Sequence, residues 1–291
     1  MRTRHFVQLI FLSALWGWSF PLVRIASPAF GPVGLAGIRC AFAAVVLVVL
    51  MRVLRQRWPA RGTWKGMTLL SLLTVVAPFV FVNSAGLVLP SGYSAVFNAT
   101  TPLFGVMAAA AMGEERLTPA RLVGCALGFL GVILLVRLGP MAVDKWVVLG
   151  ALACIVASAS YGFGTLLMKR AAMAHQPLPT SAMVHVAGSL VLLVPATATI
   201  PLMHPTWGAL AAAAFIGAVT SGFMYWLSMR LLREIPASAA TSSAFMIPLF
   251  GVAWGRIFLD EPVTAGMLPG CLLVLAAMAL VTGFNPFRRA A

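Results

Sequence analysis

Acidic residues are almost missing from this sequence: six Asp and Glu stand against 20 Lys and Arg, and 9% of the 291 residues carry a charge. A soluble domain would carry about 25% charged residues, so a water-exposed globule is excluded. No Cys-x-x-Cys pair or His/Cys cluster occurs, so neither a disulfide framework nor a metal site is expected, and no cofactor is predicted. The four cysteines are predicted to be small packing residues: Cys40, Cys125, Cys154 and Cys271.

The net charge of +14 would suit a nucleic-acid-binding protein. The basic residues, however, lie in short breaks between apolar runs and not along one continuous face. We interpret them as topology signals, and nucleic acid is not an expected partner.

Long apolar runs fill the rest of the chain: 61% of the residues are hydrophobic and the mean hydropathy is +0.99. A membrane-spanning helix needs about 20 apolar residues. Ten runs of about this length are present, at about 6–25, 32–53, 66–86, 91–112, 119–138, 146–167, 180–200, 207–229, 236–258 and 265–284. The pattern predicts an all-α integral membrane protein with ten transmembrane helices, the first of them an uncleaved span.

The distribution of Lys and Arg predicts the orientation, because cytoplasmic segments carry an excess of both. With the N-terminus inside, 15 of the 20 basic residues fall in cytoplasmic segments. Four fall at outer ends (Arg24, Arg137, Lys145 and Arg256), and Arg39 lies within the second run. An even number of spans with both termini in the cytoplasm is therefore favoured.

The chain contains an internal repeat. Residues 102–106 and 248–252 are identical, and the offset of 146 pairs Glu115 with Glu261. A weaker offset of 145 aligns residues 16–18 with residues 161–163. The halves, 1–140 and 146–291, would hold five spans each, and an odd number inverts the second half in the membrane. Two inverted copies are typical of transporters; the alternative is a membrane scaffold without transport.

Several motifs resemble a known family. They include Trp16-Gly17-Trp18-Ser19-Phe20, Arg39, Pro102 and Gly113-Glu114-Glu115, with Pro248 and Asp260-Glu261-Pro262 in the second half. This two-copy pattern resembles the EamA-type drug/metabolite transporter superfamily, and within it bacterial amino-acid exporters. The resemblance implies ten helices, two EamA-like repeats, a basket-like cavity and export of small metabolites. The second half departs from it in lacking an evident equivalent of Arg39.

Aromatic and polar residues in the runs are candidates for substrate binding, since an aromatic face at mid-depth suits a flat or apolar side chain. The candidates are Trp16, Trp18, Tyr93, Phe97, Asn98, Thr101, Tyr161, Phe163, Tyr225 and Ser243. Lipid contact or an interfacial belt is the alternative. Pro102 and Pro248 would kink their helices and act in gating, with a packing kink as the alternative.

No acidic residue lies at mid-depth, so proton coupling through Asp or Glu is not supported. His185 and Arg39 are candidates for coupling or anion contact; a packing histidine and a snorkelling arginine are the alternatives. The cavity should suit neutral or zwitterionic cargo, moved by facilitated or exchange-type transport.

We therefore expect a multi-pass transporter of the bacterial inner membrane that exports amino acids, with aromatic or large neutral side chains favoured. Broad drug/metabolite efflux is the alternative, and no motif favours an enzyme. The expected partners are a small-molecule substrate and membrane lipids, and the protein would be a monomer or homodimer.

Overall fold

The computed structural model describes residues 3–137, 144–260 and 267–282, and in these ranges the chain is helical without strands. Seven helical stretches in the described ranges are long and apolar enough to cross a membrane. The helices are α1 (Thr3–Val53), α2 (Trp64–Ser71), α3 (Ala77–Val88), α4 (Ser91–Asn98), α5 (Thr101–Ala111), α6 (Pro119–Arg137), α7 (Lys145–Ala174), α8 (Pro177–Thr197), α9 (Trp207–Phe215), α10 (Met224–Leu232), α11 (Ala237–Ser242), α12 (Ile247–Leu259) and α13 (Met267–Thr282). The short turns are η1 (Arg61–Thr63), η2 (Leu72–Val76), η3 (Ile200–Leu202), η4 (Ile216–Phe223) and η5 (Ser243–Phe245).

The 51-residue helix α1 bends sharply at Gly31, whose φ of 67° and ψ of 165° are not helical. A positive φ is readily available only to glycine, and Pro32 next to it removes an amide donor. The kink separates two apolar segments, which cover the predicted runs 6–25 and 32–53. The two predicted spans thus join without an intervening loop.

Two helical stretches contain a π-helical turn at positions related by the offset of 146. The turn η2 joins α2 to α3, and η4 joins α9 to α10. Such widened turns leave backbone groups less regularly paired and often occur at functional sites. They put Thr74 and Thr220 at corresponding places in the two halves of the sequence.

Glycines let one helix from each half pack closely on a helix of the other half. An added Cβ at Gly17 would lie 2.6 Å from the Cβ of Phe250, and one at Gly162 would lie 2.6 Å from the Cβ of Phe104. Phe104 and Phe250 are the equivalent residues of the identical segments 102–106 and 248–252. Hence α1 packs on α12 while α7 packs on α5.

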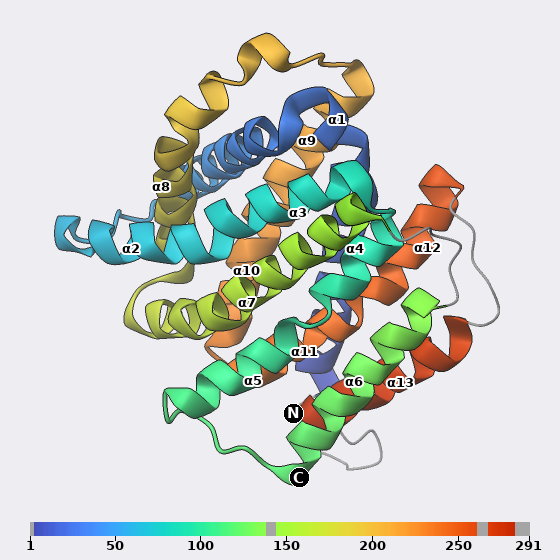
Figure 1. Cartoon of the computed structure of the whole chain (residues 1–291). Helices are drawn as coiled ribbons and strands as arrows, with labels where there is room; N and C mark the ends of the chain where they lie inside the picture. Colours follow the sequence, from blue (N-terminus) through green and yellow to red (C-terminus); the bar gives the residue numbers. More distant parts are fainter. Residues whose placement is uncertain (1–2, 138–143, 261–266, 283–291) are drawn as a thin grey trace.

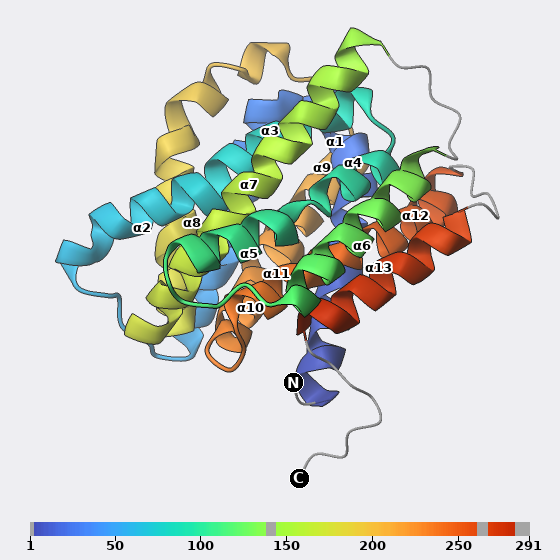
Figure 2. The same ribbon diagram turned by 60° about the horizontal axis from the view of Figure 1, so that its bottom comes forward.

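The helices α6 and α13 lie side by side at one flank of the molecule in both Figures 1 and 2 and pack along each other. The outer surface of the bundle is apolar: Leu193, Val194 and Val45 are 56%, 75% and 60% exposed. Side chains of this kind facing outward suit a hydrocarbon surrounding, in which all backbone polar groups must be paired within helices.

Candidate functional site

A cavity lies among α1, α3, α4, α5, α7, α10, α11 and α12 and the turns η2, η4 and η5. The centres of water molecules could occupy about 150 Å³ of it. One water needs about 10–15 Å³ on that measure, so the space is large enough for several waters or a small molecule. Its wall is largely apolar, with Phe20, Val23, Phe79, Val82 and Ile247 among the lining residues. A concave, mostly apolar site with a few polar groups is the usual form of a small-molecule site.

The wall contains seven of the residues singled out in the sequence: Trp16, Arg39, Asn98, Thr101, Tyr161, Tyr225 and Ser243. Trp16 and Tyr161, paired by the offset of 145, enter from α1 and α7. The indole Nε1 of Trp16 donates to the Thr220 carbonyl at 3.1 Å, which holds its ring against the π-helical turn. The hydroxyls of Tyr225 and Thr74 bond at 2.9 Å. Both halves of the sequence therefore contribute to one site.

Pro102 and Pro248 occupy the first turns of α5 and α12, directly after breaks in the helical stretches. The Asn98 carbonyl, which the proline leaves without a helical donor, accepts from the hydroxyls of Thr101 at 2.7 Å and Ser158 at 3.2 Å. These bonds compensate for the break at Pro102. The breaks place Asn98, Thr101 and Ser243 at the cavity.

Arg39 is 5% exposed and has only neutral partners in the wall. Nη1 donates to Asn83 Oδ1 at 3.0 Å, and Nη2 donates to Ser221 Oγ at 3.3 Å. The guanidinium carbon lies 3.7 Å from the centroid of the Phe79 ring. The snorkelling alternative is not what the structure shows, because this side chain is directed to the interior.

Four predicted binding residues lie away from the cavity wall. Trp18 packs on Phe215 and Phe258, with ring centroids 4.7 and 5.4 Å away. Phe163 is 44% exposed on the outer surface. Each follows a lining residue by two positions, and residues two apart on a helix point in nearly opposite directions.

Tyr93 and Phe97 are the other two residues outside the cavity wall. They share a face of α4, but that face packs against Ala85, Leu89 and Cys154. This face does not continue into α5, because α4 ends at Asn98.

His185 lies behind the cavity wall. It is 0% exposed, its Nδ1 donates to the Ser181 carbonyl at 2.9 Å, and its ring meets Tyr225 edge to face at 4.8 Å. The offset of 146 pairs His185 with Arg39 and Tyr225 with Phe79. A histidine therefore stands where the second half would carry a counterpart of Arg39.

Sequence reasoning missed the polar residues of the π-helical turns, namely Thr74, Thr220 and Ser221, which also line the cavity. The signal that could have found them is the repeat itself, since Thr74 and Thr220 are related by the same offset as the identical segments. Single hydroxyl residues in apolar runs are otherwise too common to mark a site.

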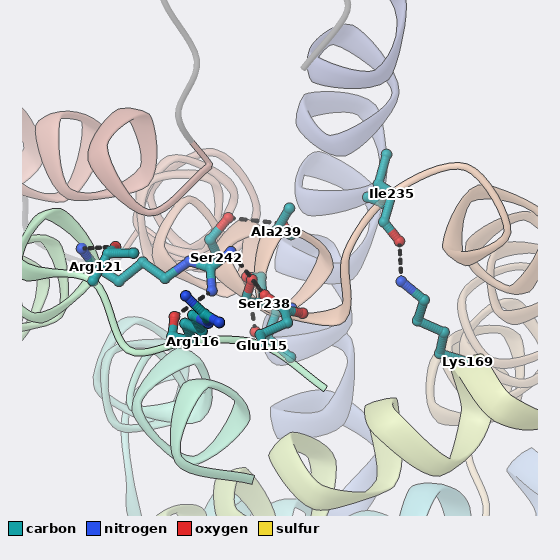
Figure 3. A network of polar contacts seen from close by, with 10 residues as sticks. Glu115, Arg116, Arg121, Lys169, Ile235, Ser238, Ala239 and Ser242 are labelled. Atoms are coloured by element: carbon teal, nitrogen blue, oxygen red, sulfur yellow. Dashed lines mark hydrogen bonds and ion pairs between the residues drawn. The ribbon is translucent and has the colours of Figure 1, made fainter. Parts of the chain in front are cut away.

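A polar network around Glu115 connects several helices (Figure 3). Glu115 accepts from the Ser238 amide at 3.2 Å and from the Ser238 hydroxyl, and it pairs with Arg121 at 2.8 Å. Glu114 pairs with Arg170 at 2.6 Å. Lys169 donates to the Ile235 carbonyl at 2.9 Å. Apart from the Arg121 and Lys169 contacts, these bonds join the first half of the sequence to the second.

Glu261, the repeat counterpart of Glu115, lies outside the described residues. Within the described ranges no group of three or more His, Cys, Asp or Glu side chains could hold a metal ion.

A helical, membrane-spanning bundle around a largely apolar cavity with a few polar groups is the architecture of a small-molecule transporter. Residues 6–137 and 148–283 each match the EamA-like transporter family, and the chain belongs to it. It is 28% identical to the transporter YvbV of Bacillus subtilis (strain 168), over 100% of this chain and 95% of YvbV.

Two further similarities are informative. The chain is 26% identical to a Streptantibioticus cattleyicolor protein named "Probable terminal-alkyne amino-acid exporter", over 94% of this chain and 91% of that protein. A solved structure, titled only "Crystal structure of protein", superimposes with a TM-score of 0.76 at 17% identity, covering 97% and 99% of the two chains. At this identity the superposition supports the fold alone.

Proposed function

We propose that this transporter exports amino acids with aromatic or large neutral side chains across the bacterial inner membrane. The main support for the proposal is the cavity. Its wall is aromatic and aliphatic, and its lining residues include one cation and no carboxylate. A small zwitterion with an apolar side chain matches the chemistry of this wall. The amino-acid exporter among the relatives supports the same class of substrate.

Broad efflux of cationic drugs is less well supported, because a cation would meet Arg39 and no acidic side chain in the wall. Without a buried Asp or Glu in the wall, facilitated or exchange-type transport is the simplest mechanism.

We further propose ten spans, arranged as five-helix repeats 1–140 and 146–291 that are inverted relative to each other, with both termini in the cytoplasm. Support comes from the kink at Gly31, which divides α1 into two apolar segments. The excess of Lys and Arg at alternate connections supports the orientation. Two halves of opposite orientation around one cavity would permit alternating access.

Flux from liposomes tests the substrate class. Liposomes that contain the purified protein and are preloaded with radiolabelled phenylalanine, tyrosine or tryptophan should release the amino acid faster than equally loaded liposomes without protein. Trp16→Ala should lower this flux about tenfold, since it removes a wall residue and its bond to Thr220. Trp146→Ala is the matched control, because Trp146 is 55% exposed and outside the cavity wall. Release equal to that of empty liposomes across a panel of amino acids would refute the proposal.

Cysteine labelling tests the topology. Single cysteines at Glu115 and Glu261, in a protein whose own cysteines are replaced, should react with an impermeant maleimide from opposite sides of the membrane. Labelling from the same side would exclude the inverted arrangement.

A further inference from the structure

We propose that Arg39 binds the carboxylate of the transported molecule and so makes the carboxylate the group that the cavity selects. This inference rests on the proposed function. It names the carboxylate as the group of the substrate that the site recognises. On this proposal Arg39 determines substrate specificity, whereas the alternative is that Arg39 only holds helices together.

The first observation is unused hydrogen-bonding capacity. A guanidinium carries five N–H donors, and the described residues accept two of them, at Asn83 and Ser221. Nε is buried without a partner, so the donors left for a ligand are the remaining hydrogens of Nη1 and Nη2. A group that lines a cavity with donors to spare can add a ligand without giving up its existing bonds.

The second observation is an uncompensated charge. Each described carboxylate makes its contacts elsewhere: Glu114 with Arg170, Glu115 with Arg121 and Ser238, Glu234 with Arg4 and His5, Asp260 with Arg256, and Asp144 with the first turn of α7. The neutral partners of Arg39 hydrogen-bond the cation but cannot neutralise it. A buried cation is costly unless paired, so an entering carboxylate would meet the strongest unsatisfied charge in the wall.

The third observation is that the guanidinium is held in place before any ligand arrives. Asn83 donates its Nδ2 to the Pro32 carbonyl at 3.1 Å, which directs its Oδ1 to Arg39. The Phe79 ring supports one face of the guanidinium plane. A planar fork held in this way suits a carboxylate, which it can bind through two parallel hydrogen bonds.

The counterpart in the second half does not duplicate this arrangement. His185 packs against Tyr225 as Arg39 packs against Phe79, yet its remaining nitrogen Nε2 is buried without a partner and does not line the cavity. A neutral imidazole would offer an acceptor there and no donor. Recognition of the carboxylate is therefore assigned to the first half alone.

Substrate pairs that differ only in this group provide the test. Wild-type protein in liposomes should transport L-phenylalanine at least tenfold faster than L-phenylalaninamide, which keeps the ammonium and the ring. Arg39→Gln should lower phenylalanine flux about ten- to a hundredfold, the usual worth of a hydrogen bond to a charged group, while amide flux changes less than about twofold. Arg39→Lys should retain part of the preference, because the charge remains but the fork is lost.

Two further variants serve as controls. His185→Gln, at the equivalent place in the second half, should leave the acid-to-amide ratio unchanged. Arg256→Gln removes an exposed cation outside the cavity and should change neither flux, since the Arg256 side chain is 58% exposed. Thermal unfolding of each variant in detergent reports whether it folds.

Equal transport of acid and amide by the wild type would overturn the inference while leaving transport intact. A loss of both fluxes in Arg39→Gln in equal proportion would assign Arg39 a structural role instead.

If no amino acid is transported, ligand-induced thermal stabilisation of the protein tests carboxylate binding directly. Stabilisation by phenylalanine but not by its amide, lost in Arg39→Gln, would keep the inference and refute the export proposal. Stabilisation by neither, or by both equally, would refute the inference as well.

Discussion

The carboxylate of Glu234, between α10 and α11, contacts two side chains from the start of α1. It accepts from His5 Nε2 at 2.9 Å and from Arg4 Nη2 at 2.6 Å. The hydrogen bond from His5, and secondarily the charge of Arg4, lowers the pKa of Glu234 below its ordinary value. The folded protein therefore favours the ionised carboxylate. Ionisation of Glu234 therefore stabilises the folded protein at pH values above the ordinary carboxyl pKa. This stabilisation is lost as the pH falls through the lowered pKa of Glu234.

The expected consequence is a small acid-induced loss of stability that Glu234→Gln should abolish. The wild type should show a slightly larger drop of its unfolding temperature than the variant when the pH in detergent is lowered from 6 to 3. The difference should shrink at high salt, because the pair is exposed. Equal pH profiles of the two proteins would show that this contact does not contribute.

At the scale of the elements, breaks in helices and close approaches between them position the site. The prolines at the starts of α5 and α12 let polar side chains reach the cavity. The glycines at the crossings of α1 with α12 and of α7 with α5 bring backbones from the two halves together. At Gly162 an added Cβ would lie 2.7 Å from the backbone nitrogen of Gly105. Backbone cannot swing aside as a flexible side chain can, so only glycine fits this crossing.

Gly162→Ala should therefore destabilise the protein by about 1–3 kcal/mol, the usual cost of overpacking. Gly66→Ala is the matched control, since nothing lies within 4 Å of a Cβ there. Gly66 is inside the helix α2, where alanine should be neutral or stabilising by about 0.5–1 kcal/mol. Unfolding titrations in mixed detergent measure both changes. A Gly162→Ala protein as stable as the control would show that this crossing is loosely packed.

For the whole molecule, the network around Glu115 joins the two halves at the end that we predict to face the cytoplasm. The contacts from Glu115 to Ser238 and from Glu114 to Arg170 would break if the two halves separated at that end. Alternating access therefore predicts that weakening them shifts the population of conformations towards opening at this end.

Glu115→Gln should accordingly raise the labelling rate of a cavity cysteine, placed at Thr165, about fivefold when an impermeant reagent is added to inside-out vesicles. The amide keeps the shape of the side chain but loses the charge that pairs with Arg121. Asp260→Asn is the matched control, because it removes an exposed charge that pairs with Arg256 of α12. An unchanged rate in Glu115→Gln would mean that these contacts do not hold the end closed.

Sequence alone was enough to predict the helical class, the membrane location, the two related halves and the family. Each of these depends on local chemistry: about 20 apolar residues form a span wherever they occur, and a repeated segment keeps its offset. The same reasoning found Trp16, Asn98, Tyr161 and Arg39, which the structure brings to one cavity.

Only the tertiary structure decided which face of each helix meets the cavity. Trp16 lines it and Trp18 does not, and the same holds for Tyr161 and Phe163. In water the polar face of a helix would reveal its orientation, but in lipid the outer face is as apolar as the packed one. The breaks after Asn98 and before Ile247, and the pairing of Arg39 with Asn83, Ser221 and Phe79, likewise depend on contacts between distant segments. Hydrophobic pattern therefore sets which segments enter the membrane, whereas packing between helices sets what they enclose.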